Sequence, residues 1–518
     1  ADPASKPRYR NLLEILELLG IVIRQARIQR ESEREYGWPE YHWVSVPIFV
    51  FFLGYIVYWY LQGSVRFPAL GAIRFEFLMG AALFALAIPA YFTNPNRERS
   101  GVGVWVVLLF ALIVIMVWFS YAPEISYLVF IDRVVKFALL GFFIAAFVTT
   151  PGRLGWFIGA FLFACLKMGQ EGFLGTITGS LIWENQGIPR LHGSTPNYAH
   201  PNSFSGMAVG CLPFVLYFYR IVPWYLRLAL LVQIVFMLNI ILFTGSRTGY
   251  VALIIGVGFL AWKAENRKRV FLALLIAGFA VAPFIPQDYI GRARSVFTQE
   301  EVEGRSIEAR KEILEDAVRI FIDNPLGVGV HAFPMVRQDR FGRSQDTHNL
   351  YLEVATNLGI QGLIVFIGFV FALLRILSRL AASIDRQIEL VEQVLSRPPP
   401  ANATDRSREH LRDLRIMRAT CKAVYIFLII RLGLGLFGMD LYEIYWWFAL
   451  GTTVAIWNVN VVARQRTDML RDSADLIEGE CGGVGADPGP AVRSISEPTK
   501  DLPVSASSTL SSRRGAEG

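Results

Sequence analysis

Apolar segments of the length that crosses a membrane recur along this chain of 518 residues. A transmembrane helix needs roughly 20 consecutive apolar residues. Hydrophobic residues make up 53% of the chain and charged residues only 18%, which does not suit a protein whose whole surface faces water. The composition therefore predicts an all-α, polytopic integral membrane protein with about 12 transmembrane helices. The apolar segments lie at 43–62, 69–92, 102–121, 128–149, 154–169, 203–221, 224–244, 248–263, 270–285, 350–376, 420–437 and 443–463.

The distribution of Lys and Arg predicts how these segments are oriented. The N-terminal segment 1–42 is basic and amphipathic, and we expect it to lie along the cytoplasmic membrane surface. Alternate loops after it carry basic residues, such as Arg97, Arg153 and Arg220, whereas the short loops between them have few. The positive-inside rule then places both termini in the cytoplasm. The net charge of +7 reflects this orientation and does not indicate nucleic-acid binding.

The same pattern divides the chain into five parts. Residues 43–285 hold nine predicted transmembrane helices and a smaller outer loop at 170–202. Residues 286–347 form a large, partly helical outer loop. Three further helices occupy 348–464, with a polar cytoplasmic loop at 378–419. The tail 465–518 is rich in Gly, Ser, Pro and charge, which predicts disorder.

The large outer loop places an arginine on the apolar face of an amphipathic helix. A helical projection of "SIEARKEILEDAVRIF" puts Arg310 in the middle of that face and Arg305 outside it. An arginine that faces a protein interior is costly unless an anionic group meets it. That group is either a ligand or a buried carboxylate such as Asp346. The apolar members of the face are Ile307, Leu314, Ala317 and Phe321.

Two further outer motifs carry candidate residues. "FTGSRTGY" places Arg247 between two glycines at the outer end of a span; the alternative is an arginine that snorkels to the interface. "IPRLHGSTPNYAHPNSFSG" holds Arg190 and Asn202 before another span. Its histidines, His192 and His200, have no Cys or acidic cluster beside them, so we predict no metal site.

A histidine lies where the large outer loop meets the next apolar segment. In "DTHNLYLEVATNLGIQG", His348 is followed by Asn349 and Tyr351. His348 either marks a helix boundary or acts on a substrate at the membrane surface. Several arginines with one histidine on the outer side suit a phosphate-bearing ligand and a proton acceptor. The residues in question are Arg190, Arg247, Arg310 and His348.

Over residues 130–375 the chain resembles the O-antigen ligase superfamily, which includes O-antigen ligases, O-antigen polymerases and related bacterial polysaccharide transferases. The resemblance rests on "RLHGSTPNYAHPNSFSG", on "TGSRTG", on Arg310 fifteen residues before the proline of "NPLGVGVHAF", and on "THNLYLEVATNLGIQG". By motif position it implies that Arg247, Arg310 and His348 are catalytic. One departure is Leu314, where members often carry tryptophan. Around these residues we expect substrate-binding contacts from Arg190, Asn202, Arg305, Asn349 and Tyr351.

The resemblance implies transfer of a glycan from an undecaprenyl diphosphate-linked donor to an acceptor hydroxyl. The acceptor is lipid A core or another glycan, and the site faces the periplasm from the bacterial inner membrane. Arginines would stabilise the leaving diphosphate, and neutral His348 would take the hydroxyl proton, so we expect no metal and no cofactor. The alternatives are a polymerase of the same superfamily and a transporter or flippase of lipid-linked sugars. Charged residues inside candidate spans keep the transporter open: Arg74, Glu76, Asp132, Arg133, Lys136 and Arg431.

The predicted orientation is testable by cysteine labelling. In a variant without native cysteines, a cysteine at Ser344 should react with an impermeant thiol reagent on intact spheroplasts. A cysteine at Ala403 should react only after the membrane is opened, because 378–419 is predicted to be cytoplasmic. Equal labelling of the two positions would contradict the orientation.

Overall fold

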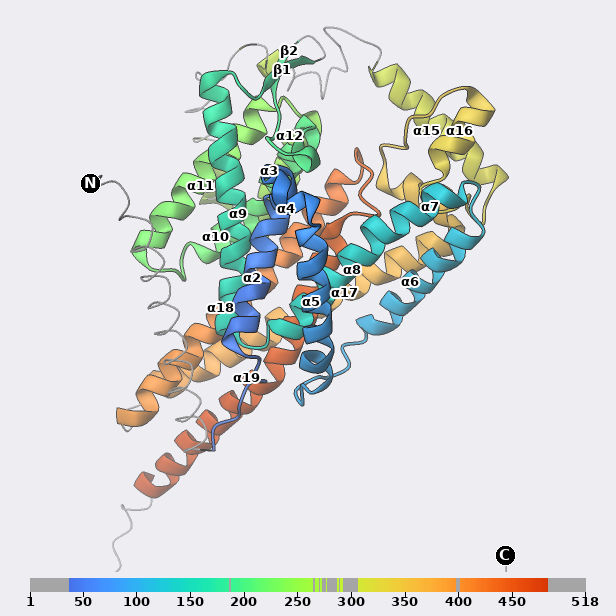
Figure 1. The fold of residues 1–518 in the computed structure, drawn as a ribbon. Coiled ribbons are helices and arrows are strands. Elements are labelled where there is room, and N and C mark those ends of the chain that lie inside the picture. Colours follow the sequence, from blue (N-terminus) through green and yellow to red (C-terminus); the bar gives the residue numbers. More distant parts are fainter. Residues whose placement is uncertain are drawn as a thin grey trace, which may run out of the picture. The chain divides into compact units, whose positions relative to one another are not determined.

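The structure is a computed structural model that describes residues 37–185, 188–263, 306–396 and 401–482, with single positions or short runs between 266 and 291. This part of the chain is almost entirely helical (Figure 1). The chain divides into a large unit, 1–472, and a small unit, 473–518. In the small unit, the described residues form the end of the last helix.

The described elements follow one another in chain order, and one two-stranded antiparallel hairpin interrupts the helices. The first group is α2 (Val46–Tyr60), α3 (Gly63–Arg66), α4 (Pro68–Ala72), α5 (Phe75–Phe92), α6 (Val102–Trp118), α7 (Pro123–Val129), the π-helical turn η2 (Phe130–Val135), α8 (Lys136–Phe147) and α9 (Pro151–Thr178). The second is β1 (Ile182–Asn185), β2 (Ile188–Leu191), the 3₁₀ turn η3 (Pro196–Tyr198), α10 (Pro201–Phe218), α11 (Trp224–Phe243) and α12 (Arg247–Lys263). The third is α15 (Ser306–Asp323), α16 (Phe333–Phe341), α17 (Leu350–Ser396), α18 (Ala401–Leu434) and α19 (Ile444–Gly482).

Several of these helices have the length and apolarity of membrane spans. Five described helices qualify, namely α5, α9, α11, α17 and α19, and α2, α6 and α12 are shorter apolar helices. Large apolar side chains lie exposed along their outer faces, for example Phe77, Val104, Leu228 and Ile364. A protein in water rarely exposes apolar surface on this scale, so the chain is an α-helical membrane protein. The segment 270–285 lies mostly outside the described residues, and the total of about 12 helices stays a prediction.

Helix α10 lies at the centre of the packing. Nearly all of its side chains are buried, and it contacts α9, α11, α12 and α18. Its N-terminus follows directly on the segment that holds the hairpin β1–β2 and the turn η3. The residues just before this helix, including the hairpin and η3, are therefore anchored to the middle of the bundle.

Two segments predicted to be irregular are helical. The predicted loop 378–419 consists of the continuation of α17 to Ser396 and of α18 from Ala401. The predicted disordered tail begins inside α19, which continues to Gly482. In the extension of α17, Ile384 and Ile388 are buried, while Arg415 of α18 pairs with Glu392 at 3.0 Å on the surface. Average hydrophobicity hides such an amphipathic helix, because the polar face cancels the apolar face.

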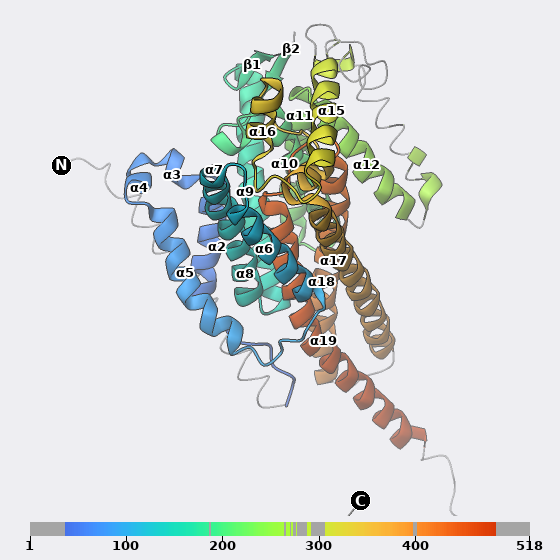
Figure 2. The ribbon, with the colours of Figure 1, turned by 90° about the vertical axis from the view of Figure 1, so that its right-hand side faces the viewer.

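Helix α17 is broken near its start, and the outer loop fills the break. Gly359 has φ 72° and ψ −169°, a backbone conformation that is essentially restricted to glycine. Three backbone hydrogen bonds join the loop to the break: Val328 N–H to Thr356 O (2.8 Å), Gly329 N–H to Asn357 O (3.0 Å) and Ile360 N–H to Pro325 O (2.9 Å). The motifs "NPLGVG" and "ATNLGI" are thus a matched pair of backbone segments. Figure 2 shows α15 and α16, which flank this loop, beside the start of α17.

Replacing Gly359 by alanine should destabilise the protein. A Cβ there would lie 2.4 Å from the carbonyl carbon of Leu326, and the positive φ adds strain, so we expect a loss of about 3 kcal/mol or more. Gly54→Ala is the matched control, because a Cβ at Gly54 meets nothing within 4 Å inside α2. Thermal unfolding in detergent measures both variants. Equal melting temperatures would contradict the pairing of loop and helix.

Candidate functional site

Arg247 begins α12, and a polar network holds the turn before it. The Ser246 hydroxyl accepts a hydrogen bond from Gly249 N–H (3.1 Å) and so caps the helix. It also donates to Asn202 Oδ1 (3.0 Å), which accepts a second bond from Arg190 Nη2 (3.0 Å). Arg190 is buried, and its Nε donates to the Thr244 carbonyl (2.8 Å). These contacts show that Arg190 and Asn202 position the "TGSR" turn, and the positive charge of Arg190 adds to the field at that turn; direct contact of either residue with substrate stays a prediction.

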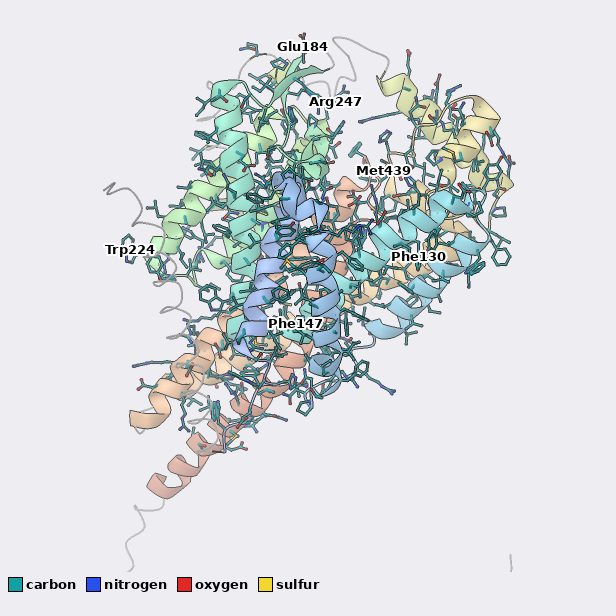
Figure 3. All side chains as sticks on the ribbon, viewed as in Figure 1. Phe130, Phe147, Glu184, Trp224, Arg247 and Met439 are labelled. Carbon is teal, nitrogen blue, oxygen red and sulfur yellow. The ribbon has the colours of Figure 1, made fainter. Side chains whose placement is uncertain are left out.

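Arg247 itself is half-buried at this turn. Figure 3 places it at the same end of the helices as Glu184 of the hairpin and Met439 of the loop before α19. The N-terminus of α12 adds a partial positive charge to that of the guanidinium. Both favour an anionic ligand at this position.

Arg310 lies on the buried side of α15, although that side differs from the predicted one. The buried stripe consists of Ile313, Ala317 and Ile320, and half-buried Arg310 continues it toward the helix start. Leu314, predicted on the apolar face, is exposed. The projection erred because α15 buries its stripe against α16 and α17, and the wider apolar surface of an isolated helix does not reveal which part is covered. Arg305 lies outside the described residues.

A buried ion pair that the sequence did not reveal fixes α15 against α16. Arg337 of α16 is fully buried, and its Nε donates to Asp316 Oδ2 of α15 (2.9 Å). Its Nη1 donates to Gln345 Oε1 (2.6 Å). Removing one partner of such a pair leaves an uncompensated buried charge. The pair therefore sets the rotation of α15 and the direction in which Arg310 points.

His348 lies immediately before the cap of α17, in a left-handed backbone conformation. Its φ is 48°, which is uncommon for any residue except glycine. Asn349 Oδ1 accepts hydrogen bonds from Tyr351 N–H (3.0 Å) and Leu352 N–H (3.1 Å), so Asn349 is the helix cap. The cap holds the turn, and the turn presents the exposed ring of His348 to the outer surface.

Asn349 and Tyr351, which follow His348, join the start of α17 to the end of α18 and the residues just after it. Asn349 Nδ2 donates to the Leu436 carbonyl (3.1 Å), and the Tyr351 hydroxyl donates to the Leu432 carbonyl (2.9 Å). These polar groups are engaged within the protein. The structure thus gives Asn349 and Tyr351 a role in holding His348, while substrate contacts from either residue stay a prediction.

One electrostatic cluster joins the candidates from separate elements. His200 caps α10, and its Nδ1 accepts from Asn202 N–H (3.1 Å). Protein atoms displace water from the His200 ring and lower its pKa, and the charges of Arg190, His348 and Arg310 lower it further. Partial desolvation and the Arg310 charge likewise lower the pKa of His348. Residues 190, 200, 310 and 348 therefore lie close enough to influence one another's charge, with both histidines favoured in the neutral form.

Comparison with known families bears on this cluster. Residues 232–367 match the family model described as O-antigen ligase. This segment is similar to an O-antigen ligase domain. The matched segment includes Arg247, Arg310 and His348, and the predicted resemblance is confirmed. The O-antigen ligase family comprises glycosyltransferase-like ligases and polymerases that act on lipid-linked glycans and glycan acceptors at bacterial membranes. No curated protein matches the chain.

The sequence alone did not identify Arg337 and His331 of this region, and it assigned no role to His200. His200 had a readable signal, because a residue followed by Pro201 at the first helical position is a typical helix start. Arg337 and His331 had none, since their partners are distant in sequence or in irregular loops. Within the described residues, no three His, Cys, Asp or Glu side chains are grouped to hold a metal ion; metal dependence is a question for experiment.

The pKa of His348 is measurable by NMR on histidine-labelled protein in nanodiscs, with His348→Gln for assignment. We expect a value below the ordinary 6.5, so that the ring is neutral at pH 7. Arg310→Gln should raise that pKa, because it removes a positive charge that disfavours protonation. Arg319→Gln, on the exposed face of the same helix, should leave it unchanged. Equal effects of the two substitutions would contradict the contact between Arg310 and His348.

Proposed function

We propose that this protein transfers a glycan from an undecaprenyl diphosphate-linked donor to an acceptor hydroxyl at the outer face of the bacterial inner membrane, as an O-antigen ligase. The observation that carries the proposal is the cluster of Arg190, Arg310, His200 and His348, which includes residues of the segment similar to an O-antigen ligase domain. Arg247 extends the positive charge at the start of α12. A diphosphate is the group that such a cluster suits best.

The chemistry divides between the arginines and His348. The acceptor oxygen forms a bond to the anomeric carbon of the donor sugar, while the bond from that carbon to the diphosphate oxygen breaks. The electron pair stays with the diphosphate, whose developing charge Arg247 and Arg310 stabilise. The hydroxyl proton passes to the neutral ring of His348. A lowered pKa keeps that ring unprotonated at neutral pH, and no step calls for a divalent metal.

The contacts of the charged residues inside the predicted spans weaken the transporter alternative. Lys136 pairs with Asp132 at 2.8 Å and Arg133 with Glu443 at 2.6 Å. Buried Arg431 donates to the Gly206 carbonyl (3.0 Å) and lies 3.3 Å from the ring centroid of Tyr445. Each of these charges has a partner within the protein, which is the arrangement expected of ion pairs with a structural role. A polymerase would use the same site with a second lipid-linked glycan as acceptor, and analysis of the surface glycans after gene deletion distinguishes the two.

Substitutions of Arg310 test the diphosphate contact. Arg310→Ala should reduce turnover roughly 100-fold or more, as expected for losing a charged contact that strengthens in the transition state. Arg310→Lys should restore part of the activity, because an ammonium keeps the charge but lacks the planar fork. Arg319→Ala, on the exposed side of α15, is the matched control and should be nearly neutral. A strong effect of Arg319→Ala would point to general disruption of the helix.

His348→Ala separates proton transfer from donor binding. We expect turnover to be abolished while the purified protein still binds the lipid-linked donor, because the arginines remain. Turnover of the wild-type protein should be unchanged in EDTA. An active His348→Ala variant would leave this residue as a helix boundary, and loss of activity in EDTA would refute the metal-free mechanism.

A further inference from the structure

A cavity of about 310 Å³ lies between the start of α17, the loop before α16 and the loop before α19. Asp346, two residues before His348, and Glu353, in the first turn of α17, line it together with His331, Tyr442 and Met439. The volume is at the small end of the range for ligand pockets. The cavity is separate from the arginine cluster described above.

Buried hydrogen-bonding groups in this cavity lack protein partners. Glu353 is 2% exposed; its Oε2 accepts from Leu441 N–H (3.1 Å), and its Oε1 has no hydrogen bond among the described residues. The Tyr442 hydroxyl is also buried, and within the described part of the chain it makes no well-aligned hydrogen bond. A buried polar atom without a partner is costly. The Glu353 carboxyl group and the Tyr442 hydroxyl can therefore form further hydrogen bonds with a ligand in the cavity.

The carboxylate of Asp346 is also available on one side. Its Oδ1 accepts from Thr347 N–H (2.8 Å). Its Oδ2 lies 3.6 Å from His331 Nδ1, too far for a hydrogen bond. Asp346 Oδ2 and His331 Nδ1 can therefore each form a hydrogen bond with a hydroxyl group of a ligand. A hydroxyl both donates and accepts, as this mixed lining requires.

The charge of the cavity selects among such ligands. Asp346 and Glu353 place two carboxyl groups in the lining, and the one arginine there, Arg133, pairs with Glu443 at 2.6 Å. An anionic ligand would meet unfavourable like charge. A neutral or amino-bearing sugar would not, and the apolar side chain of Met439 offers a surface for its C–H face.

Charges of the arginine cluster and of this cavity both act on His348. Arg310 lowers the pKa of His348 and Asp346 raises it, so the ring is near charges of both signs. The donor diphosphate is expected on the arginine side. The side of His348 that faces the charge of Asp346 is then available for the acceptor hydroxyl, which loses its proton in the reaction.

We propose that the cavity lined by Asp346, Glu353 and Tyr442 binds the terminal sugar of the glycan acceptor, a neutral or amino-bearing pyranose, and presents its hydroxyl to His348. The transfer of the proton to His348 rests on the proposed function, whereas binding of a sugar in the cavity does not. The acceptor hydroxyl gives its proton to His348 as its oxygen bonds to the donor's anomeric carbon, and the donor's diphosphate leaves with the electron pair.

Binding of simple sugars tests the cavity without donor or turnover. The probes are the methyl glycosides of glucose, glucosamine and glucuronate. Saturation-transfer NMR with the full-length protein in nanodiscs measures the binding of each. The first two should bind in the millimolar range, and the glucuronide should bind about tenfold more weakly or less, because it adds a negative charge. Equal binding of all three, or binding of none, would overturn the inference.

Variants locate the bound sugar. Tyr442→Phe should weaken binding about five- to tenfold, the contribution of one hydrogen bond. Met439→Trp should fill the cavity with a larger side chain. Because Met439 lies in a partly exposed loop, this variant should fold even if the substitution of buried Tyr442 prevents folding. Tyr121→Phe is the matched control, because its hydroxyl bonds to Asp339 outside the cavity. Unchanged binding in both cavity variants would overturn the proposal.

Turnover distinguishes failure of the site from failure of the proposed function. In a transfer assay, Tyr442→Phe should raise the KM for the acceptor and leave donor binding unchanged. Transfer with an unaltered acceptor KM in both cavity variants would refute the sugar site and leave the ligase function intact. Sugar binding that follows the prediction, in a protein that transfers nothing, would support the site and refute the proposed reaction.

Discussion

The backbone pairing at the break in α17 is the constraint on which the rest of the outer surface depends. The segment 325–329 occupies the gap that Gly359 opens, so the loop carrying α15 and α16 is held by the same helix that His348 precedes. The buried pair Arg337–Asp316 then sets the rotation of α15. Through these two contacts Arg310 and His348, 38 residues apart in sequence, come within electrostatic reach of each other.

A second organising feature is the separation of charge around His348. Arg310 of α15 and Arg337 of α16 bring positive charge to it, whereas carboxyl groups lie at Asp346 and in the first turn of α17. Under the proposed function, such an arrangement suits a reaction in which an anionic diphosphate leaves a sugar and an acceptor hydroxyl takes its place. It also explains why the histidine must be neutral: the arginines oppose its protonation, and a base must be free to accept a proton. The caps at Ser246, His200 and Asn349 hold these elements at the surface.

Sequence patterns predicted well where the physical signal is local. Apolar length indicated the membrane helices, and the motifs around Arg247, Arg310 and His348 identified the family. The same reasoning failed at 378–419 and 465–482, which are helical although their average polarity resembles that of a loop; in 378–419 the two helices α17 and α18 pack together. It also misjudged the buried face of α15, since a helix with several apolar positions does not show which of them its neighbours cover.

The sequence by itself determined that this chain is a helical membrane protein with a segment similar to an O-antigen ligase domain, because span length, composition and motif spacing are properties of contiguous residues. It also singled out Arg310 and His348 as unusual for their positions. Only the tertiary structure decided that Arg190 and Asn202 hold a turn, that Arg337 takes the buried carboxylate of Asp316, and that Asp346, Glu353 and Tyr442 enclose one cavity. Those relations join residues from separate helices, and which helices meet is set by packing across the whole bundle, a constraint that no local pattern contains.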